Sequence, residues 1–141
     1  MAGYSGTPLA AKLGIKPGHR VVLVRAPEGF EATLEPLPDG TRLGRRLVTH
    51  PDLVLVFTTA RTDLARRVPH LAPRVFPSGA LWVAWPKRSS GVATDLTEDV
   101  LREVCLPLGI VDTKVCAVDE TWSGLRFVWR REHRVASGGS Y

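Results

Sequence analysis

Three short, almost wholly apolar runs constrain the fold of this chain more than any other feature. They are "RVVLV" at 20–24, "PDLVLVF" at 51–57 and "GALWVAW" at 79–85. A run that is apolar at nearly every position suits a strand covered on both faces, as in a parallel sheet that lies between helices. The three runs therefore predict three buried strands.

Two segments with helical periodicity alternate with these runs. The first lies between the second and third runs, and its apolar positions are Leu64, Val68, Leu71 and Val75. The second follows the third run, and its apolar positions are Leu96, Val100, Leu101, Val104, Cys105 and Leu108. Both repeats have the spacing of an amphipathic helix. Strands that alternate with helices predict a parallel α/β sheet with right-handed crossovers.

The C-terminal part of the chain has a different pattern. "IVDTKVCAV" at 110–118 and "GLRFVWR" at 124–130 suit two strands, and the short connection "DETWS" makes them antiparallel neighbours. Segment 30–52 is weaker. "TRLGRRLV" at 41–48 is either a very short edge strand or an irregular excursion, because a parallel crossover usually takes a dozen or more residues.

The sequence therefore predicts an α/β fold with three layers, in which a mostly parallel sheet ends in an antiparallel hairpin. We expect it to be truncated over 30–52. One domain is expected over 1–134, followed by a small, polar, flexible tail over 135–141.

The charge and composition narrow the class of protein. The net charge is +5, with 15 Arg but only 4 Lys, two Ile, and neither Asn nor Gln. This bias is typical of a G+C-rich genome, so the basic character favours a solvated surface over a nucleic-acid-binding face.

The chain has no signal-like leader and no apolar run of about 18 residues, which predicts a cytoplasmic protein without a membrane span. Cys105 and Cys116 are expected to be reduced core thiols, and the scattered histidines predict no metal site.

The order of the elements resembles the Rossmann-like fold of S-adenosylmethionine-dependent methyltransferases. The matching pieces are "LGIKPGHRVVLV", "PDLVLVF" and "LAPRVFPSGALWVAWPK", followed by the last helix and the hairpin. The chain looks still more like a small bacterial family to which no activity is assigned, through "YSGTPLAAKLGI" and "TDLTED…DETWSGLR". The resemblance implies a methyltransferase-like fold in a degenerate form.

The cofactor motif of that fold is absent from the expected turn. A nucleotide-type site needs glycines after the first strand, because they let the ligand approach the backbone amides. Here the turn is "RAPEGF", with Gly29 alone, and Pro27 removes one amide donor. A ribose-binding carboxylate is expected after the second strand, where this chain has Arg45 and Arg46. We therefore predict no cofactor.

Several polar residues converge on one predicted edge. In an open parallel sheet, ligands bind outside the carboxyl ends of the strands, and the hairpin turn reaches the same edge. The candidate ligand-binding residues are Glu28, Thr58, Thr59, Lys87, Arg88, Ser89, Ser90, Asp119, Glu120 and Trp122. We expect Lys87 or Arg88 to lie near Asp119 or Glu120, either in an ion pair or as opposite walls of a pocket.

Each of these residues also has a structural interpretation. The threonines suit a strand end, the serines suit any loop, and Asp119 with Glu120 suits a hairpin turn. Asp95 with Glu98 has the spacing of a capping box, and Thr97 is a rival cap for the same helix. No catalytic residue can be assigned, because no serine has a histidine that the topology places nearby.

Three functions remain open. The first is a non-catalytic, methyltransferase-like binding or regulatory domain that takes a small anionic ligand or a protein partner. The second is a small enzyme in which Lys87 and Arg88 orient an anionic substrate and Asp119 or Glu120 transfers a proton. The third is a nucleic-acid-binding module, which the spread of the cations does not favour. The sequence leans against catalysis and leaves homo-oligomerisation open.

Overall fold

The computed structural model describes residues 6–138, which form a six-stranded sheet in the order β2-β1-β3-β4-β6-β5. The strands are β1 (Arg20–Val24), β2 (Arg42–Gly44), β3 (Leu53–Phe57), β4 (Ala80–Pro86), β5 (Ile110–Ala117) and β6 (Trp122–Trp129). The first four strands are parallel, and β6 pairs antiparallel with both β4 and β5. The predicted mostly parallel sheet with a C-terminal antiparallel hairpin is confirmed.

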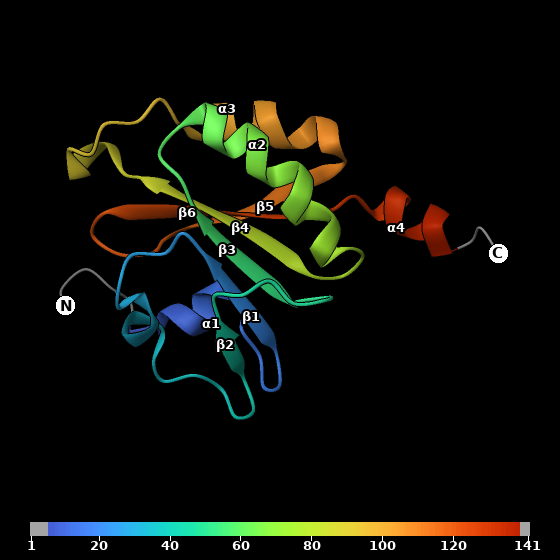
Figure 1. Cartoon of the computed structure of the whole chain (residues 1–141), viewed down its shortest axis with the longest axis horizontal. Helices are drawn as coiled ribbons and strands as arrows, with labels where there is room; N and C mark the ends of the chain where they lie inside the picture. Colours follow the sequence, from blue (N-terminus) through green and yellow to red (C-terminus); the bar gives the residue numbers. More distant parts are fainter. Residues whose placement is uncertain (1–5, 139–141) are drawn as a thin grey trace.

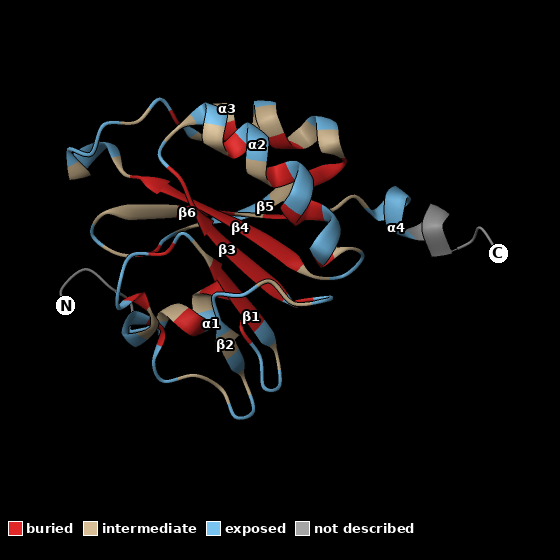
Figure 2. Cartoon of the chain, viewed as in Figure 1, coloured by how far each residue is buried: buried red, intermediate tan, exposed pale blue. Residues whose placement is uncertain are grey.

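Helices cover both faces of this sheet, which gives three layers (Figure 1). The helices of the first face are α1 (Leu9–Leu13) and the 3-10 turn η1 (Phe30–Leu34), and those of the second are α2 (Arg61–Leu71) and α3 (Glu98–Cys105). Shorter 3-10 turns are η2 (Ala72–Val75), η3 (Arg88–Ser90) and η4 (Leu106–Leu108). Strands β3 and β4 are buried at every residue (Figure 2), as their unbroken apolar runs predict.

The weak segment 30–52 contains a very short edge strand. Strand β2 has 3 residues and pairs with the first half of β1. Residues 45–52 then lead to β3, on the other side of β1, without forming a helix. The face of β1 and β2 on the α2 side therefore has no helix of its own to cover it.

Two nearby residues, Asp95 and Thr97, cap the starts of different helices, α2 and α3. The hydroxyl of Thr97 accepts the amide of Val100 at 3.2 Å, so Thr97 is the cap of α3. The carboxylate of Asp95 instead accepts the amide of Arg61 at 2.8 Å, at the start of α2. The capping box predicted for Asp95 and Glu98 is therefore wrong, because the segment before α3 passes over the start of α2.

The chain ends in a projecting helix. Helix α4 (Arg131–Gly138) follows β6 directly and extends away from the sheet (Figure 1). The flexible tail predicted over 135–141 overlaps the end of α4, and its last three residues lie outside the described residues, as do residues 1–5 of the predicted domain. Both expectations stay predictions. No helix within residues 6–138 is long and apolar enough to cross a membrane.

Candidate functional site

A crevice of about 330 Å³ opens at the carboxyl ends of the parallel strands. The end of β1, the turn from β3 into α2, and the start of β6 form its walls. The lining residues are Arg25, Phe57, Thr58, Thr59, Asp63 and Trp122. Thr58, Thr59 and Trp122 were among the predicted site residues, whereas Arg25, Phe57 and Asp63 were not.

Thr58 and Asp63 form the fixed wall of the crevice. The Thr58 side chain is buried, and its hydroxyl donates to the Asp63 carboxylate at 2.8 Å. Arg66 and Arg67 each donate to the other oxygen of Asp63, at 2.8 and 2.9 Å. Partial burial raises the pKa of Asp63, but the hydrogen bonds from Thr58 and both arginines outweigh it and lower the pKa overall. Asp63 is therefore an ionised and already neutralised carboxylate, unsuited to act as a general base.

Aromatic rings form the opposite wall. The Trp122 and Phe57 rings meet edge to face with centroids 5.0 Å apart, and Phe57 meets Phe30 in the same way at 4.9 Å. Trp122 is half-buried, so part of its ring remains open to the crevice. Such edge-to-face contacts hold a ring in one orientation, which gives the crevice a fixed apolar wall.

Arg25 supplies the unpaired charge of the crevice. It is exposed, follows the last residue of β1, and has φ = 62°. A residue other than glycine in the left-handed region costs about 1–3 kcal/mol and is typical of functional sites. Within residues 6–138, Arg25 forms no ion pair. The lining therefore holds one cation without an ion-pair partner and one carboxylate, Asp63, whose charge Arg66 and Arg67 offset from outside the crevice.

The loop after β4 and the hairpin turn lie side by side, as predicted. The amide of Lys87 donates to the carbonyl of Thr121 at 2.7 Å, directly beyond the pairing of Pro86 with Trp122. However, neither Lys87 nor Arg88 forms an ion pair with Asp119 or Glu120 anywhere in the described chain. The ion pair is therefore not formed; the two loops meet through backbone atoms, and the Lys87 side chain is half-buried while that of Arg88 is exposed.

Two of the predicted polar residues serve the loops themselves. The Asp119 carboxylate accepts the amides of Thr121 and Trp122, at 2.8 and 2.9 Å. The Ser90 hydroxyl donates to the carbonyl of Lys87 at 2.7 Å and accepts the amide of Val92 at 3.2 Å. Both are side-chain turns of the kind that polar residues form locally. The remaining candidates are exposed and do not line the crevice: Glu28, Arg88, Ser89 and Glu120.

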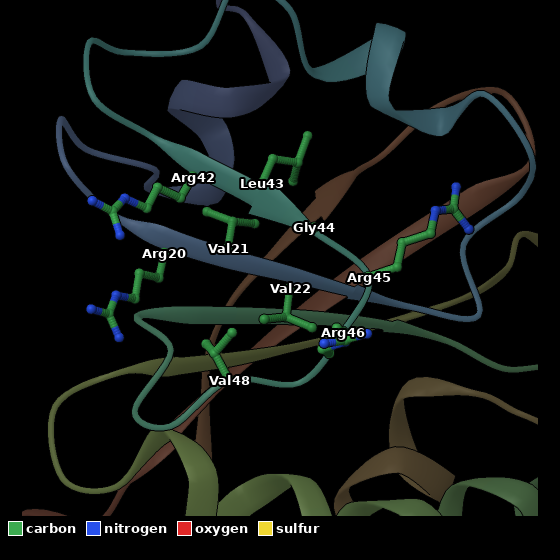
Figure 3. A pocket seen from close by; sticks show the side chains of 9 residues that line it. All are labelled: Arg20, Val21, Val22, Arg42, Leu43, Gly44, Arg45, Arg46 and Val48. Atoms are coloured by element: carbon green, nitrogen blue, oxygen red, sulfur yellow. The ribbon is translucent and has the colours of Figure 1, made fainter.

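The turn after β1, which spans residues 25–30, is held in place by an arginine side chain. Arg45 directly follows β2 and extends away from Arg20 and Arg42 toward this turn (Figure 3). Its guanidinium donates to the carbonyls of Ala26 and Pro27, each at 2.8 Å. It also forms a two-pronged ion pair with Glu31, at 2.8 and 3.1 Å. We call this arrangement of Arg45, Ala26, Pro27 and Glu31 the arginine clamp.

The clamp changes the ionisation of Glu31. Hydrogen bonds from Arg45 lower the pKa of the Glu31 carboxyl from 4.5 to about 2. The same interaction raises the pKa of Arg45. Because the folded-state pKa is below the unfolded value, the clamp stabilises the fold fully above about pH 4.5, and this contribution is lost as pH falls toward 2.

We expect the carboxyl carbon of Glu31 to titrate with a midpoint of about 2 by NMR. In the Arg45→Ala protein the midpoint should move up toward the ordinary value of 4.5, because the guanidinium, the main cause of the lowered pKa, is gone. Arg46→Ala is the matched control, since the neighbouring arginine does not contact Glu31 and should leave the midpoint unchanged. A midpoint near 4.5 in the unmodified protein would show that the clamp does not form.

The residues of the first turn do not fit S-adenosylmethionine in the usual mode. That mode needs free backbone amides in the turn and an acid after the second strand. Pro27 has no amide, Arg45 replaces the acid, and its guanidinium is bonded to the turn carbonyls. The turn therefore lacks the amide donor and the acid on which the usual mode depends.

Metal and thiol chemistry have no evident centre in the described chain. Across residues 6–138 no group of three or more His, Cys, Asp or Glu side chains is placed to hold a metal ion. Cys105 and Cys116 are both free thiols. Burial, with a smaller effect of Asp112, raises the pKa of Cys105 to about 12, and burial also raises that of Cys116. Neither thiol is activated as a nucleophile.

The fold is similar to solved structures of S-adenosylmethionine-dependent methyltransferases. One from Aquifex aeolicus has a TM-score of 0.62 and 13% sequence identity, covering 84% of this chain and 86% of that one. The fibrillarin pre-rRNA processing protein of Methanococcus jannaschii has a TM-score of 0.58 and 10% identity, covering 86% of this chain and 73% of that one. Magnesium protoporphyrin IX methyltransferase from Synechocystis PCC 6803, solved with bound S-adenosylmethionine, has a TM-score of 0.57 and 10% identity, covering 86% and 74%.

No family model and no curated protein matches the chain. At identities of 10–13%, the shared structure establishes the fold alone. The chain therefore has a methyltransferase-like α/β fold, as its sequence predicts.

Proposed function

We propose that this chain is a non-catalytic binding or regulatory domain that takes a small anionic ligand in the crevice at the carboxyl edge of the sheet. The observation that carries the proposal is the arginine clamp. Arg45 holds the first turn closed with four hydrogen bonds, at the place where the methyltransferase-like fold would receive its cofactor. The crevice beside it keeps an unpaired cation.

The chemistry of the crevice favours an anion with a small polar body. Arg25 presents an exposed guanidinium, which binds phosphate or carboxylate oxygens through two parallel hydrogen bonds. Thr59 is exposed beside it, and the open part of the Trp122 ring provides an apolar wall. The acid of the crevice, Asp63, is neutralised by Arg66 and Arg67 and does not repel the ligand. A small phosphorylated metabolite matches this set.

The alternatives receive less support from the geometry. An enzyme that uses Asp119 as its acid or base would have to release a carboxylate that already fixes the hairpin turn. A nucleic-acid-binding module would need a continuous basic face, whereas five arginines form ion pairs with acids on the surface: Arg45, Arg61, Arg66, Arg67 and Arg102. A protein partner, a homo-oligomer, a cytoplasmic location and the closer bacterial family stay predictions.

A thermal-shift screen of nucleotides, sugar phosphates, other phosphorylated metabolites and S-adenosylmethionine tests the proposal. We expect at least one phosphorylated compound to raise the Tm of the protein by mass action, because it binds the folded state alone. Arg25→Gly is the informative variant, since glycine tolerates the positive φ while removing the cation.

The Arg25→Gly protein should keep its fold and lose the ligand-induced rise in Tm. Arg131→Ala is the matched control, because Arg131 is an exposed arginine of α4, away from the crevice. The control should keep the rise. A full rise in the Arg25→Gly protein, or no rise with any compound in the unmodified protein, would count against the crevice as the ligand site.

A further inference from the structure

We infer that the chain has a second ligand site, a groove on the uncovered face of β1 and β2 that takes a phosphate monoester with an apolar body. The groove has a volume of about 440 Å³ and lies against the strands β1 and β2 (Figure 3). It shares no lining residue with the crevice. Its size falls in the range of small-molecule sites. Among its lining residues are Arg20, Val22, Arg42, Gly44, Arg46 and Val48.

The groove exists because of two local features of the sequence. Residues 45–52 are too few to form a crossover helix, so no helix covers this face. Residues two apart on a strand face the same side, which places Gly44 beside Arg42 and Val22 beside Arg20. Gly44 has no side chain to fill the space above β2, and a Cβ atom there would meet nothing within 4 Å.

The floor of the groove is apolar. Val22 is buried, and Val48 packs against the same cluster of core residues. Together with Gly44 they form a surface that offers no hydrogen-bonding side chain. A ligand that is only a hydrated anion gains nothing from such a floor, whereas a small ring or alkyl group buries its surface on it.

The rim of the groove is cationic. Arg20 and Arg42 are register partners in the parallel pairing of β1 and β2, and their side chains extend to the same side (Figure 3). Arg46 adds a third guanidinium, and none of the three forms an ion pair within residues 6–138. Arg20 has only a long hydrogen bond to the carbonyl of Thr49, at 3.4 Å.

No carboxylate lines the groove among the described residues. Asp52, directly before β3, uses its carboxylate to accept a hydrogen bond from the backbone amide of Arg20 at 2.8 Å. Two or three guanidiniums without a counter-charge match the double charge of a phosphate monoester, and their planar forks match its oxygens. The apolar floor and the cationic rim together select an amphiphilic anion over a purely polar one.

An NMR titration with phenyl phosphate tests this inference. We expect saturable shifts of the Val22 and Val48 methyl signals, with a Kd of about 1 mM or below. Inorganic phosphate, which lacks the ring, should bind about tenfold more weakly. The Trp122 indole signal reports on the crevice in the same spectra, so binding at the two sites is separated in one experiment.

Two variants remove the two halves of the site independently. In the protein with both Arg20→Gln and Arg42→Gln, affinity for phenyl phosphate should fall about tenfold or more. Gly44→Leu fills the groove without touching the charges and should bring phenyl phosphate down to the affinity of inorganic phosphate. Arg131→Gln is the control and should bind like the unmodified protein. All these residues are exposed, and unchanged indole signals of the buried Trp82 verify the fold.

The inference is overturned if phenyl phosphate leaves the two methyl signals unmoved, or if it binds no better than inorganic phosphate. It is also overturned if phenyl phosphate moves the Trp122 indole signal alone, a result that would support the crevice proposed above. A duplex DNA oligonucleotide that moves the groove signals while phenyl phosphate does not would assign the arginines to a nucleic acid instead. If the crevice proposal fails, this test still stands. The groove is followed by the Val22 and Val48 methyl signals, whereas the crevice is followed by the Trp122 indole signal, and the variants of the two sites are different.

Discussion

Calorimetric titration of S-adenosylmethionine into the purified protein should give no saturable heat. The expectation follows from three features of the first turn: one missing amide at Pro27, no acid after β2, and the Arg45 guanidinium bonded to the turn carbonyls. In the usual mode the cofactor needs free backbone amides in this turn and an acid after β2. The effect should be large, since the cofactor would lack its main polar contacts at this turn.

The Synechocystis methyltransferase, whose solved structure contains S-adenosylmethionine, is a suitable positive control in the same instrument. A micromolar Kd for this chain, which corresponds to about −8 kcal/mol, would contradict the expectation. It would also mean that the arginine clamp opens in solution, which the Glu31 titration detects independently.

The Trp82→Ala protein should be less stable by about 3–5 kcal/mol, a large fraction of the roughly 5–15 kcal/mol that stabilises a typical domain. Trp82 lies in the middle of β4 and has no exposed surface. Its indole donates to the carbonyl of Leu13 at 3.0 Å, at the end of α1. The substitution leaves a cavity and removes the hydrogen bond that joins β4 to the end of α1.

Urea unfolding measures this loss. Trp82→Phe helps to separate the two causes, because it removes the hydrogen bond while keeping part of the ring volume. We expect its loss to be smaller, about 1–3 kcal/mol for the acceptor left unpaired together with the volume that remains unfilled. A loss under about 1 kcal/mol for Trp82→Ala would show that α1 does not depend on this contact.

The strands were predictable because their signals are local. Residues 53–57 and 80–86 are apolar without interruption, and a strand covered on both faces is the simplest structure that accommodates such a run. The hairpin was predictable for the same reason, because the short connection between β5 and β6 leaves an antiparallel pairing as the only close return. Whether 41–48 contains a strand was left open by the sequence, because the 3 residues of β2 are too few to show a periodic pattern.

The contacts that define the site were not predictable, because they join distant segments. The pattern placed Arg45 after β2, but the partner of its guanidinium, Glu31, lies in a 3-10 turn that no periodicity marked. Asp95 caps α2 across 34 positions of sequence, a contact that depends on how the loop before α3 is laid over the sheet.

Arg25 shows a different limit of the sequence. It is the first residue of the turn "RAPEGF" and directly follows β1, but its positive φ has no signature in the residue type. Lys87 and Arg88 were placed at the correct edge, yet the loops meet there through backbone atoms and form no ion pair, a detail that order along the chain does not carry.

An NMR titration of the four tryptophan indoles with inorganic pyrophosphate tests the central claim most directly, that the carboxyl-edge crevice binds a small anion. Trp122 lines the crevice, whereas Trp129 lies at the opposite end of β6, with its indole bonded to the carbonyl of Ala72. We predict that the Trp122 signal moves saturably, that the Trp129 signal stays in place, and that Arg25→Gly abolishes the movement. A Trp122 signal that does not move, or that moves equally in the Arg25→Gly protein, would contradict the account.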